Sequence, residues 1–268
     1  RAATSDQLAV FDRHREAAAR QSADTDLMVW SESSVTVERP LETSAQLATI
    51  AQLATELDAV IIANFSEIDG DRFRNASVSI DPDTGFVSRF DKVHLVPFGE
   101  YIPLRGLVDN FADLSLISRE AIAGEGPGIL NSRLGPIGNA ISFEVYFPER
   151  VRSGMQSGAR ILTNPTLASS YTTSLVPEQS LASARLRAIE TGRWVLQAST
   201  TGYSAVVSAS GEVVLRSDLR EQTVLTTSVE LRSGNTWATD LGKLPISLIA
   251  MGLLAGNTWL QIRRRSSR

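Results

Sequence analysis

Short apolar runs alternate with amphipathic stretches in the first half of the chain. The runs at 27–30 and 59–63 contain no polar residue, which is typical of strands that are buried on both faces. Apolar positions at helical spacing predict a helix over 42–57, and a second one over 5–20. Two short strands joined by a turn, a hairpin, are expected at 76–90.

The second half of the chain repeats this order of elements. Its helix at 178–191 carries Ala182, Leu186 and Ile189 on one face. Two similar halves favour one α/β domain, in which two sheets pack face to face and the helices lie outside. The remaining elements that we expect in this half are strands at 138–143, 160–163 and 194–198, a helix at 147–157 and a hairpin at 203–215.

A run without charged residues closes the chain at 246–262, and arginines follow it directly. Its seventeen residues would span about 25 Å as a helix, which is near the lower limit for crossing a membrane. We therefore predict a transmembrane helix over 245–262. The positive-inside rule then places a basic tail, 263–268, in the cytoplasm and the domain, 1–240, on the other side. The alternative is a buried or amphipathic C-terminal helix, because the run contains Ser247, Asn257, Thr258 and Gln261.

Composition narrows the classes of function. The formal net charge of −4 argues against nucleic acid as a partner, since a nucleic-acid binder needs a basic face. The 268 residues include no cysteine, which excludes disulfides, thiolate metal sites and a cysteine nucleophile. Only two histidines are present, so a histidine-rich zinc site is excluded as well.

Three segments with charged or hydroxyl side chains follow predicted strands, where α/β domains usually hold their sites. The first carries Glu32, the second carries Lys92 and Glu100, and the third carries Ser142 and Glu144. Each is weak evidence alone, because a glutamate after a strand is usually a solvated loop carboxylate. Their order and spacing together make a specific pattern.

This pattern resembles the nitrilase superfamily, whose members take a catalytic Glu, Lys and Cys from three such segments. The run DKVHLVPFGEYIP at 91–103 is most similar to one of its families, the apolipoprotein N-acyltransferases of bacterial membranes. The similarity extends over about residues 5–262 and includes 180–190 and 201–206. It implies a nitrilase-type α/β/β/α sandwich. It also implies that membrane helices precede residue 1, because the domain lies between the last two membrane helices in that family.

The resemblance implies a role for each charged residue. Glu32 stands at the position of the general base, and Lys92 at that of the group that stabilises the oxyanion. Ser142 stands where the family has its nucleophilic cysteine. Glu100 is implied to be a second carboxylate close to the site, and Glu144 to line the pocket beside the nucleophile. Positions implied to support the site or to contact substrate are Phe143, Tyr101 and Asn164.

The implied reaction is acyl transfer in two steps. An acyl chain moves from a phospholipid to the nucleophile, and then to the α-amino group of a diacylglyceryl-modified lipoprotein cysteine. Phospholipid, lipoprotein and membrane are the implied partners, and no metal or organic cofactor is implied. The implied location is the bacterial plasma membrane, with the domain outside the cytoplasm. A soluble amidase is disfavoured by the run at 246–262 and by the apolar loop at 101–118.

Serine in place of cysteine leaves three interpretations of position 142. Ser142 is an introduced substitution that traps the enzyme, a natural change in a homologue that lost the chemistry, or a working serine nucleophile. A free thiol has a pKa of about 8.5, whereas a serine hydroxyl is far less acidic and usually needs a histidine base. Pro165, where the family usually has a polar residue, favours the second interpretation. A homologue of that kind would scaffold a membrane partner, for example a membrane glycosyltransferase such as a polyprenyl-phosphate mannose synthase.

Overall fold

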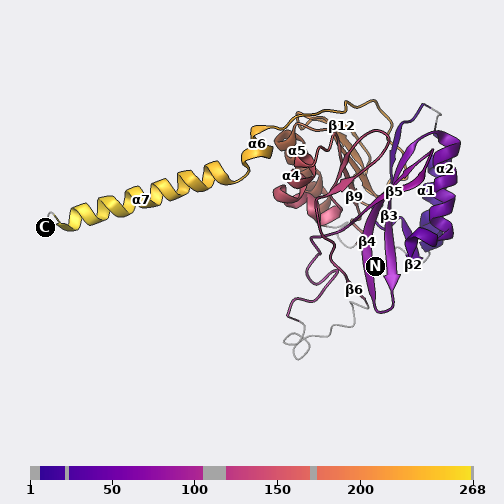
Figure 1. Cartoon of the computed structure of the whole chain (residues 1–268), viewed down its shortest axis with the longest axis horizontal. Helices are drawn as coiled ribbons and strands as arrows, with labels where there is room; N and C mark the ends of the chain where they lie inside the picture. Colours follow the sequence, from indigo (N-terminus) through magenta and orange to yellow (C-terminus); the bar gives the residue numbers. More distant parts are fainter. Residues whose placement is uncertain (1–6, 22–23, 105–118, 170–173, 267–268) are drawn as a thin grey trace.

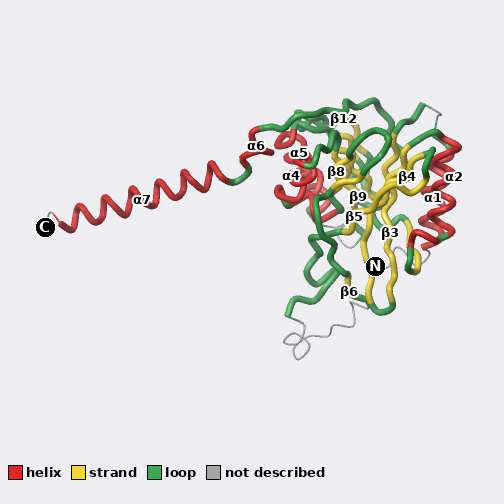
Figure 2. The backbone as a smooth tube through the Cα atoms, viewed as in Figure 1, coloured by secondary structure: helices red, strands yellow, loops and turns green. Residues whose placement is uncertain are grey.

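Two β-sheets lie against each other and helices cover their outer faces (Figures 1 and 2), in a computed structural model that describes residues 7–21, 24–104, 119–169 and 174–266. The first sheet consists of β1 (Leu27–Val29), β2 (Val35–Glu38), β3 (Val60–Asp69), β4 (Arg72–Asp81), β5 (Gly85–Asp91) and β6 (Glu120–Ala121). The second sheet consists of β7 (Ile129–Leu130), β8 (Ile137–Asn139), β9 (Leu162–Thr166), β10 (Val195–Ser199), β11 (Ala205–Val207) and β12 (Val213–Arg216). The helices are α1 (Gln7–Ala19), α2 (Ala45–Leu57), α4 (Pro148–Gln156), α5 (Val176–Thr191), α6 (Trp237–Leu241) and α7 (Leu244–Ser266), with the 3₁₀ turns η1 (Leu41–Thr43) and η2 (Ser142–Tyr146).

Three clusters of buried apolar side chains hold the four layers together. The first joins α1 and α2 to the first sheet, the second joins α4 and α5 to the second sheet, and the third lies between the sheets. Strand β3 contributes to two of them, because Val60 and Ile62 face the second sheet while Ile61 and Phe65 face the helices. Because β3 is covered on both faces, the run 59–63 contains no polar residue. The predicted α/β/β/α sandwich is confirmed.

The parallel strands of each sheet bring the functional segments to their carboxyl ends. Strand β1 pairs in parallel with β3, and β8 pairs in parallel with β9. The strand expected at 138–143 is wrong in its second half, since β8 ends at Asn139. Ser142 has a left-handed backbone, with φ of 52°, and begins η2 instead. A strand cannot continue through that conformation, so the chain leaves the sheet at this point.

Helix α5 buries a different face from the one that carries Ala182, Leu186 and Ile189. The side chains of Leu186 and Ile189 are each 54% exposed, and Leu181 and Ala184 on the opposite face pack against the second sheet. The apolar residues of α5 occur on both faces, so periodicity alone did not identify the inner one. The helix buries the small alanines because they let it lie close to the strands.

This orientation of α5 predicts unequal costs for two leucine truncations. We expect Leu181→Ala to lower the free energy of unfolding by about 2–3 kcal/mol, because its side chain is only 8% exposed. Leu186→Ala is expected to cost less than about 1 kcal/mol. Urea unfolding of both variants measures the difference. Equal costs, or a larger cost for Leu186→Ala, would contradict the observed orientation.

Helix α7 projects away from the sandwich and forms the far end of the molecule in Figure 1. Its large apolar side chains with a described exposure, from Leu244 to Ile262, are each exposed by 54% or more. No helix in the described part of the chain combines the length and the apolar character that crossing a membrane requires. The transmembrane helix predicted over 245–262 is therefore not confirmed. Polar residues such as Asn257 and Thr258 interrupt its apolar sequence.

Two further predictions from the sequence are not confirmed by the structure. Most of the apolar loop expected at 101–118 lies outside the described residues, as do 1–6 and the last two residues of the tail. The placement of 263–268 in the cytoplasm depended on the membrane span and is not confirmed either.

Candidate active site

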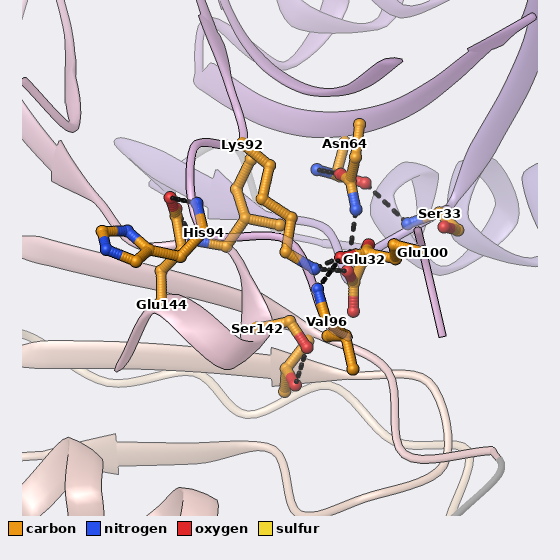
Figure 3. A network of polar contacts seen from close by, with 12 residues as sticks. Glu32, Ser33, Asn64, Lys92, His94, Val96, Glu100, Ser142 and Glu144 are labelled. Atoms are coloured by element: carbon orange, nitrogen blue, oxygen red, sulfur yellow. Dashed lines mark hydrogen bonds and ion pairs between the residues drawn. The ribbon is translucent and has the colours of Figure 1, made fainter. Parts of the chain in front are cut away.

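Lys92 lies at the centre of a buried charged cluster at the end of β5. Its side chain is 1% exposed, and Nζ lies 3.1 Å from Glu32 Oε1 and 2.8 Å from Glu100 Oε1 (Figure 3). Burial alone would lower the pKa of Lys92, but the two carboxylates outweigh it and hold that pKa above its usual value. Lys92 is therefore a fixed positive charge. Glu32, Lys92 and Glu100, which the resemblance implies to belong to one site, lie together at these distances.

Two asparagines from the middle of the first sheet position Glu32. Asn75 on β4 donates from Nδ2 to Glu32 Oε1 over 2.8 Å. Asn64 on β3 donates to Asn75 Oδ1 over 2.9 Å and accepts from the backbone N–H of Ser33 over 2.6 Å. These asparagines were not predicted as site residues. Their signal in the sequence is a polar amide inside an apolar strand, a residue that is rarely buried without hydrogen-bond partners.

The free donors and acceptors of the cluster point to its chemistry. A lysine ammonium has three N–H donors, and among the described residues Lys92 uses two of them, on Glu32 and Glu100. Glu32 accepts both of its described hydrogen bonds, from Lys92 and Asn75, at Oε1. Its Oε2 is thus available to accept a proton. Glu100 is held from the other side, because Oε2 accepts the backbone N–H of Val96 over 2.8 Å.

Ser142 lies on the opposite sheet, at the turn after β8. Its Oγ is 3.2 Å from Thr166 Oγ1, and Thr166 is its hydrogen-bond partner in the described part of the chain. Asn164 on β9 donates to the carbonyl oxygens of Ala140 and Ser142, over 2.6 and 3.5 Å. Asn164 therefore holds the backbone that presents Ser142. Thr166, whose role was not predicted, fixes the direction of the hydroxyl.

Glu144 joins the two segments that carry Lys92 and Ser142. Its carboxylate is fully buried and accepts the backbone N–H groups of Val93, His94 and Ile141 over 2.8, 3.1 and 2.9 Å. Burial raises the pKa of Glu144, while these three N–H groups oppose the rise. The expectation that Glu144 lines the pocket is corrected, since Glu144 is not among the residues that line the cavity beside Ser142 and its carboxylate accepts backbone N–H groups instead. It is a positioning residue.

Glu144→Gln is expected to lower the free energy of unfolding by about 2–3 kcal/mol. The amide keeps the shape of the side chain but replaces one accepting oxygen with an NH₂ group, which leaves at least one buried backbone N–H unpaired. Chemical denaturation measures the loss. The matched control is Glu149→Gln, whose carboxylate forms a surface ion pair with Lys243 at 3.3 Å and should cost less than about 1 kcal/mol. Equal costs would show that the buried contacts of Glu144 contribute nothing.

A cavity of about 340 Å³ opens beside Ser142, and its lining is mainly apolar. Phe143 lines it, together with Val96, whose N–H donates to Glu100. Tyr101 is not among the lining residues, and its carbonyl accepts the N–H of Phe98 over 2.8 Å. Further lining residues are Tyr146, Thr166, Leu167, Ala168, Val176, Pro177, Gln179, Ser180, Gln197, Ser199, Gly202 and Tyr203.

Comparisons with known proteins show which family the chain resembles. The profile of a family described as carbon-nitrogen hydrolase matches residues 2–239. The apolipoprotein N-acyltransferase of Methylococcus capsulatus is 31% identical over 250 residues, which are 92% of this chain and 48% of that protein. The corresponding protein of Gloeobacter violaceus is 30% identical over 225 residues, 82% of this chain and 43% of that protein. The chain thus spans about half the length of these curated relatives.

Solved structures with the same fold are more distant in sequence. A nitrilase-superfamily protein of Saccharomyces cerevisiae aligns with a TM-score of 0.63 at 22% identity, over 79% of this chain and 80% of that one. An amidase from Nesterenkonia sp. aligns with a TM-score of 0.60 at 21% identity, over 80% and 81% of the two chains. These two similarities establish the fold.

Proposed function

The chain belongs to the carbon-nitrogen hydrolase family, and we propose that its site is built for acyl transfer of the apolipoprotein N-acyltransferase kind. The observation that carries the proposal is the buried Lys92 between Glu32 and Glu100, together with the apolar cavity that begins at Ser142. Val96 links the two, since it lines the cavity and its N–H donates to Glu100. The sequence identities of 31% and 30% to apolipoprotein N-acyltransferases support this reaction over other acyl-transfer reactions.

In the first step the side chain of residue 142 attacks the carbonyl carbon of a phospholipid ester. Glu32 Oε2 takes the proton of the nucleophile, and the third N–H of Lys92 is directed to the negative oxygen of the tetrahedral intermediate. When the intermediate collapses, the ester bond breaks and the lysophospholipid leaves with the proton from Glu32. The acyl chain, now bonded to residue 142, lies in the apolar cavity.

In the second step the α-amine of a diacylglyceryl-modified cysteine attacks this acyl group. Glu32 removes a proton from the amine, an amide bond forms, and residue 142 leaves with the proton. Asn75 and Lys92 hold Glu32 in one orientation through both steps. The chemistry needs only these side chains and the two substrates, so we propose no cofactor.

Ser142 sets the rate of this reaction. A hydroxyl is far less acidic than a thiol, and a carboxylate is a weak base for it. We therefore propose that the chain with Ser142 has little or no acyltransferase activity. The same observation favours a second candidate function, in which the chain is a non-catalytic homologue that binds a membrane partner. The comparisons give no support for a glycosyltransferase as the partner, so a partner of that class stays a prediction.

The proposed location is the bacterial membrane, since the substrates of the proposed reaction are lipids. The exposed apolar side chains of α7 support it, because a helix that is apolar over most of its surface is rarely left in water. We propose that these side chains contact lipid. The side of the membrane on which the domain lies stays a prediction.

The experiment that tests the function uses the Ser142→Cys chain, phospholipid and a diacylglyceryl-cysteinyl peptide with a free amine. We expect the peptide to gain one acyl group, detected by mass spectrometry, and to gain none when Glu32→Gln is added to Ser142→Cys. If the folded Ser142→Cys protein yields no acylated peptide, acyl transfer is contradicted and the non-catalytic homologue is supported.

A further inference from the structure

A second hollow adjoins the cavity at Ser142, and the ring of Tyr203 lies in the lining of both. This hollow, which we call the arginine groove, has a volume of about 440 Å³ and lies between α5 and β12. The start of α5 lines both spaces, for example with Gln179 on the cavity and Glu178 on the groove. Tyr203 and the start of α5 therefore form a wall that the cavity and the groove share.

Two arginines from different elements converge on this groove. Arg185 on α5 donates from Nε to the carbonyl of Gly211 over 2.7 Å. This bond anchors the side chain and leaves its terminal N–H groups available to a ligand. Arg216 at the end of β12 lies over the ring of Tyr203, with its guanidinium carbon 4.6 Å from the ring centre. Neither guanidinium forms an ion pair with any described residue.

The charge of the groove is positive despite one carboxylate. Glu178 lines it as well, but this side chain accepts the hydroxyl of Tyr203 over 3.2 Å. Two arginines and one glutamate line the groove, and several N–H donors of the two arginines have no partner among the described residues. Guanidinium groups of this kind bind phosphate oxygens with paired hydrogen bonds, more strongly than neutral donors do.

We propose that the arginine groove binds the phosphodiester of the glycerophospholipid whose acyl chain occupies the cavity at Ser142. The inference rests on the proposed function and names the part of the donor that the site recognises beyond the acyl chain. Arg185 and Arg216 hold the phosphate, and Tyr203 separates it from the apolar chain.

The test is calorimetric titration of the 268-residue chain with dihexanoylphosphatidylglycerol below its micelle concentration. Arg185→Gln and Arg216→Gln are each expected to raise the dissociation constant by about tenfold, which corresponds to one lost charge-assisted contact. The matched control is Arg13→Gln on α1, an exposed arginine with no described ion pair, which should bind like the unchanged chain. Unchanged binding in both groove variants would overturn the proposal.

Two further titrations distinguish a lipid headgroup from free phosphate, and binding in the groove from binding in the cavity. Inorganic phosphate should bind at least tenfold more weakly than the lipid, and equal affinity would overturn the lipid headgroup as the source of the phosphate. Ala168→Trp fills the cavity without touching the groove and should weaken lipid binding. If Ala168→Trp weakens binding and the arginine variants do not, the groove is excluded and the proposed function stands. If the unchanged chain binds no lipid, both are contradicted.

Discussion

Ser142→Cys is expected to raise the rate of acyl-enzyme formation from phospholipid by at least about three orders of magnitude. The carboxylate of Glu32 is too weak a base to activate a hydroxyl, but a thiol is several units more acidic and its anion is a stronger nucleophile. The rest of the site is in place, with Lys92 buried between two carboxylates and the cavity open beside position 142. Removal of a nucleophile from a comparable hydrolase costs up to about 10⁶ in rate, which sets the upper limit.

The rate is measured as the burst of lysophospholipid that accompanies one turnover of the protein. Ser142→Ala is the matched control, because it removes the hydroxyl and should behave like the unchanged chain. The introduced thiol is the sole cysteine of the protein, so hydroxylamine release of the acyl group identifies a thioester without interference. If the unchanged chain shows a burst as fast as Ser142→Cys, Ser142 is itself a working nucleophile and the proposed inactivity is wrong.

Lys92→Met is expected to lower the free energy of unfolding by about 3–5 kcal/mol at neutral pH. The substitution fills nearly the same space but leaves Glu32 and Glu100 buried without their common positive partner. Because the pKa of Lys92 is raised in the folded state, its contribution is fully present below its ordinary value of 10.5. It is lost as the pH rises through the raised pKa, so the unchanged chain should lose this stability only in strong alkali.

Chemical denaturation at pH 7 measures the difference between Lys92→Met and the unchanged chain. Lys243→Met is the matched control, since Lys243 forms an exposed ion pair with Glu149 and its loss should cost less than about 1 kcal/mol. Equal stability of Lys92→Met and the unchanged chain would mean that the buried cluster is not ionised as described.

The layers were predictable because they depend on local patterns, and the charged cluster was predictable because its segments resemble those of the nitrilase superfamily. Apolar runs without polar residues indicated strands covered on both sides, and Glu32 comes shortly after one such run. Lys92 comes after the second strand of the predicted hairpin. The residues that position them depend on contacts between distant strands. Asn64 and Asn75 belong to neighbouring strands of one sheet, and sequence spacing alone does not show that their side chains meet Glu32.

Two local details were wrong for physical reasons that a single sequence does not reveal. The left-handed backbone at Ser142 ends the strand early, and serine carries no signal for that conformation as glycine would. The buried face of α5 contains alanines and Arg187, whereas two larger apolar residues face outward. Packing against the second sheet decided which face of α5 is buried, since it favoured close approach over side-chain size.

The most direct test of the site is to locate the acyl group on the protein. Ser142→Cys protein is incubated with phospholipid, digested and mapped by tandem mass spectrometry, with Ser142→Ala treated in parallel. Acyl transfer at this site predicts one acyl group on the peptide that contains position 142, and none on the Ser142→Ala protein. An acyl group on another residue, or no acyl group on folded Ser142→Cys protein, would contradict it.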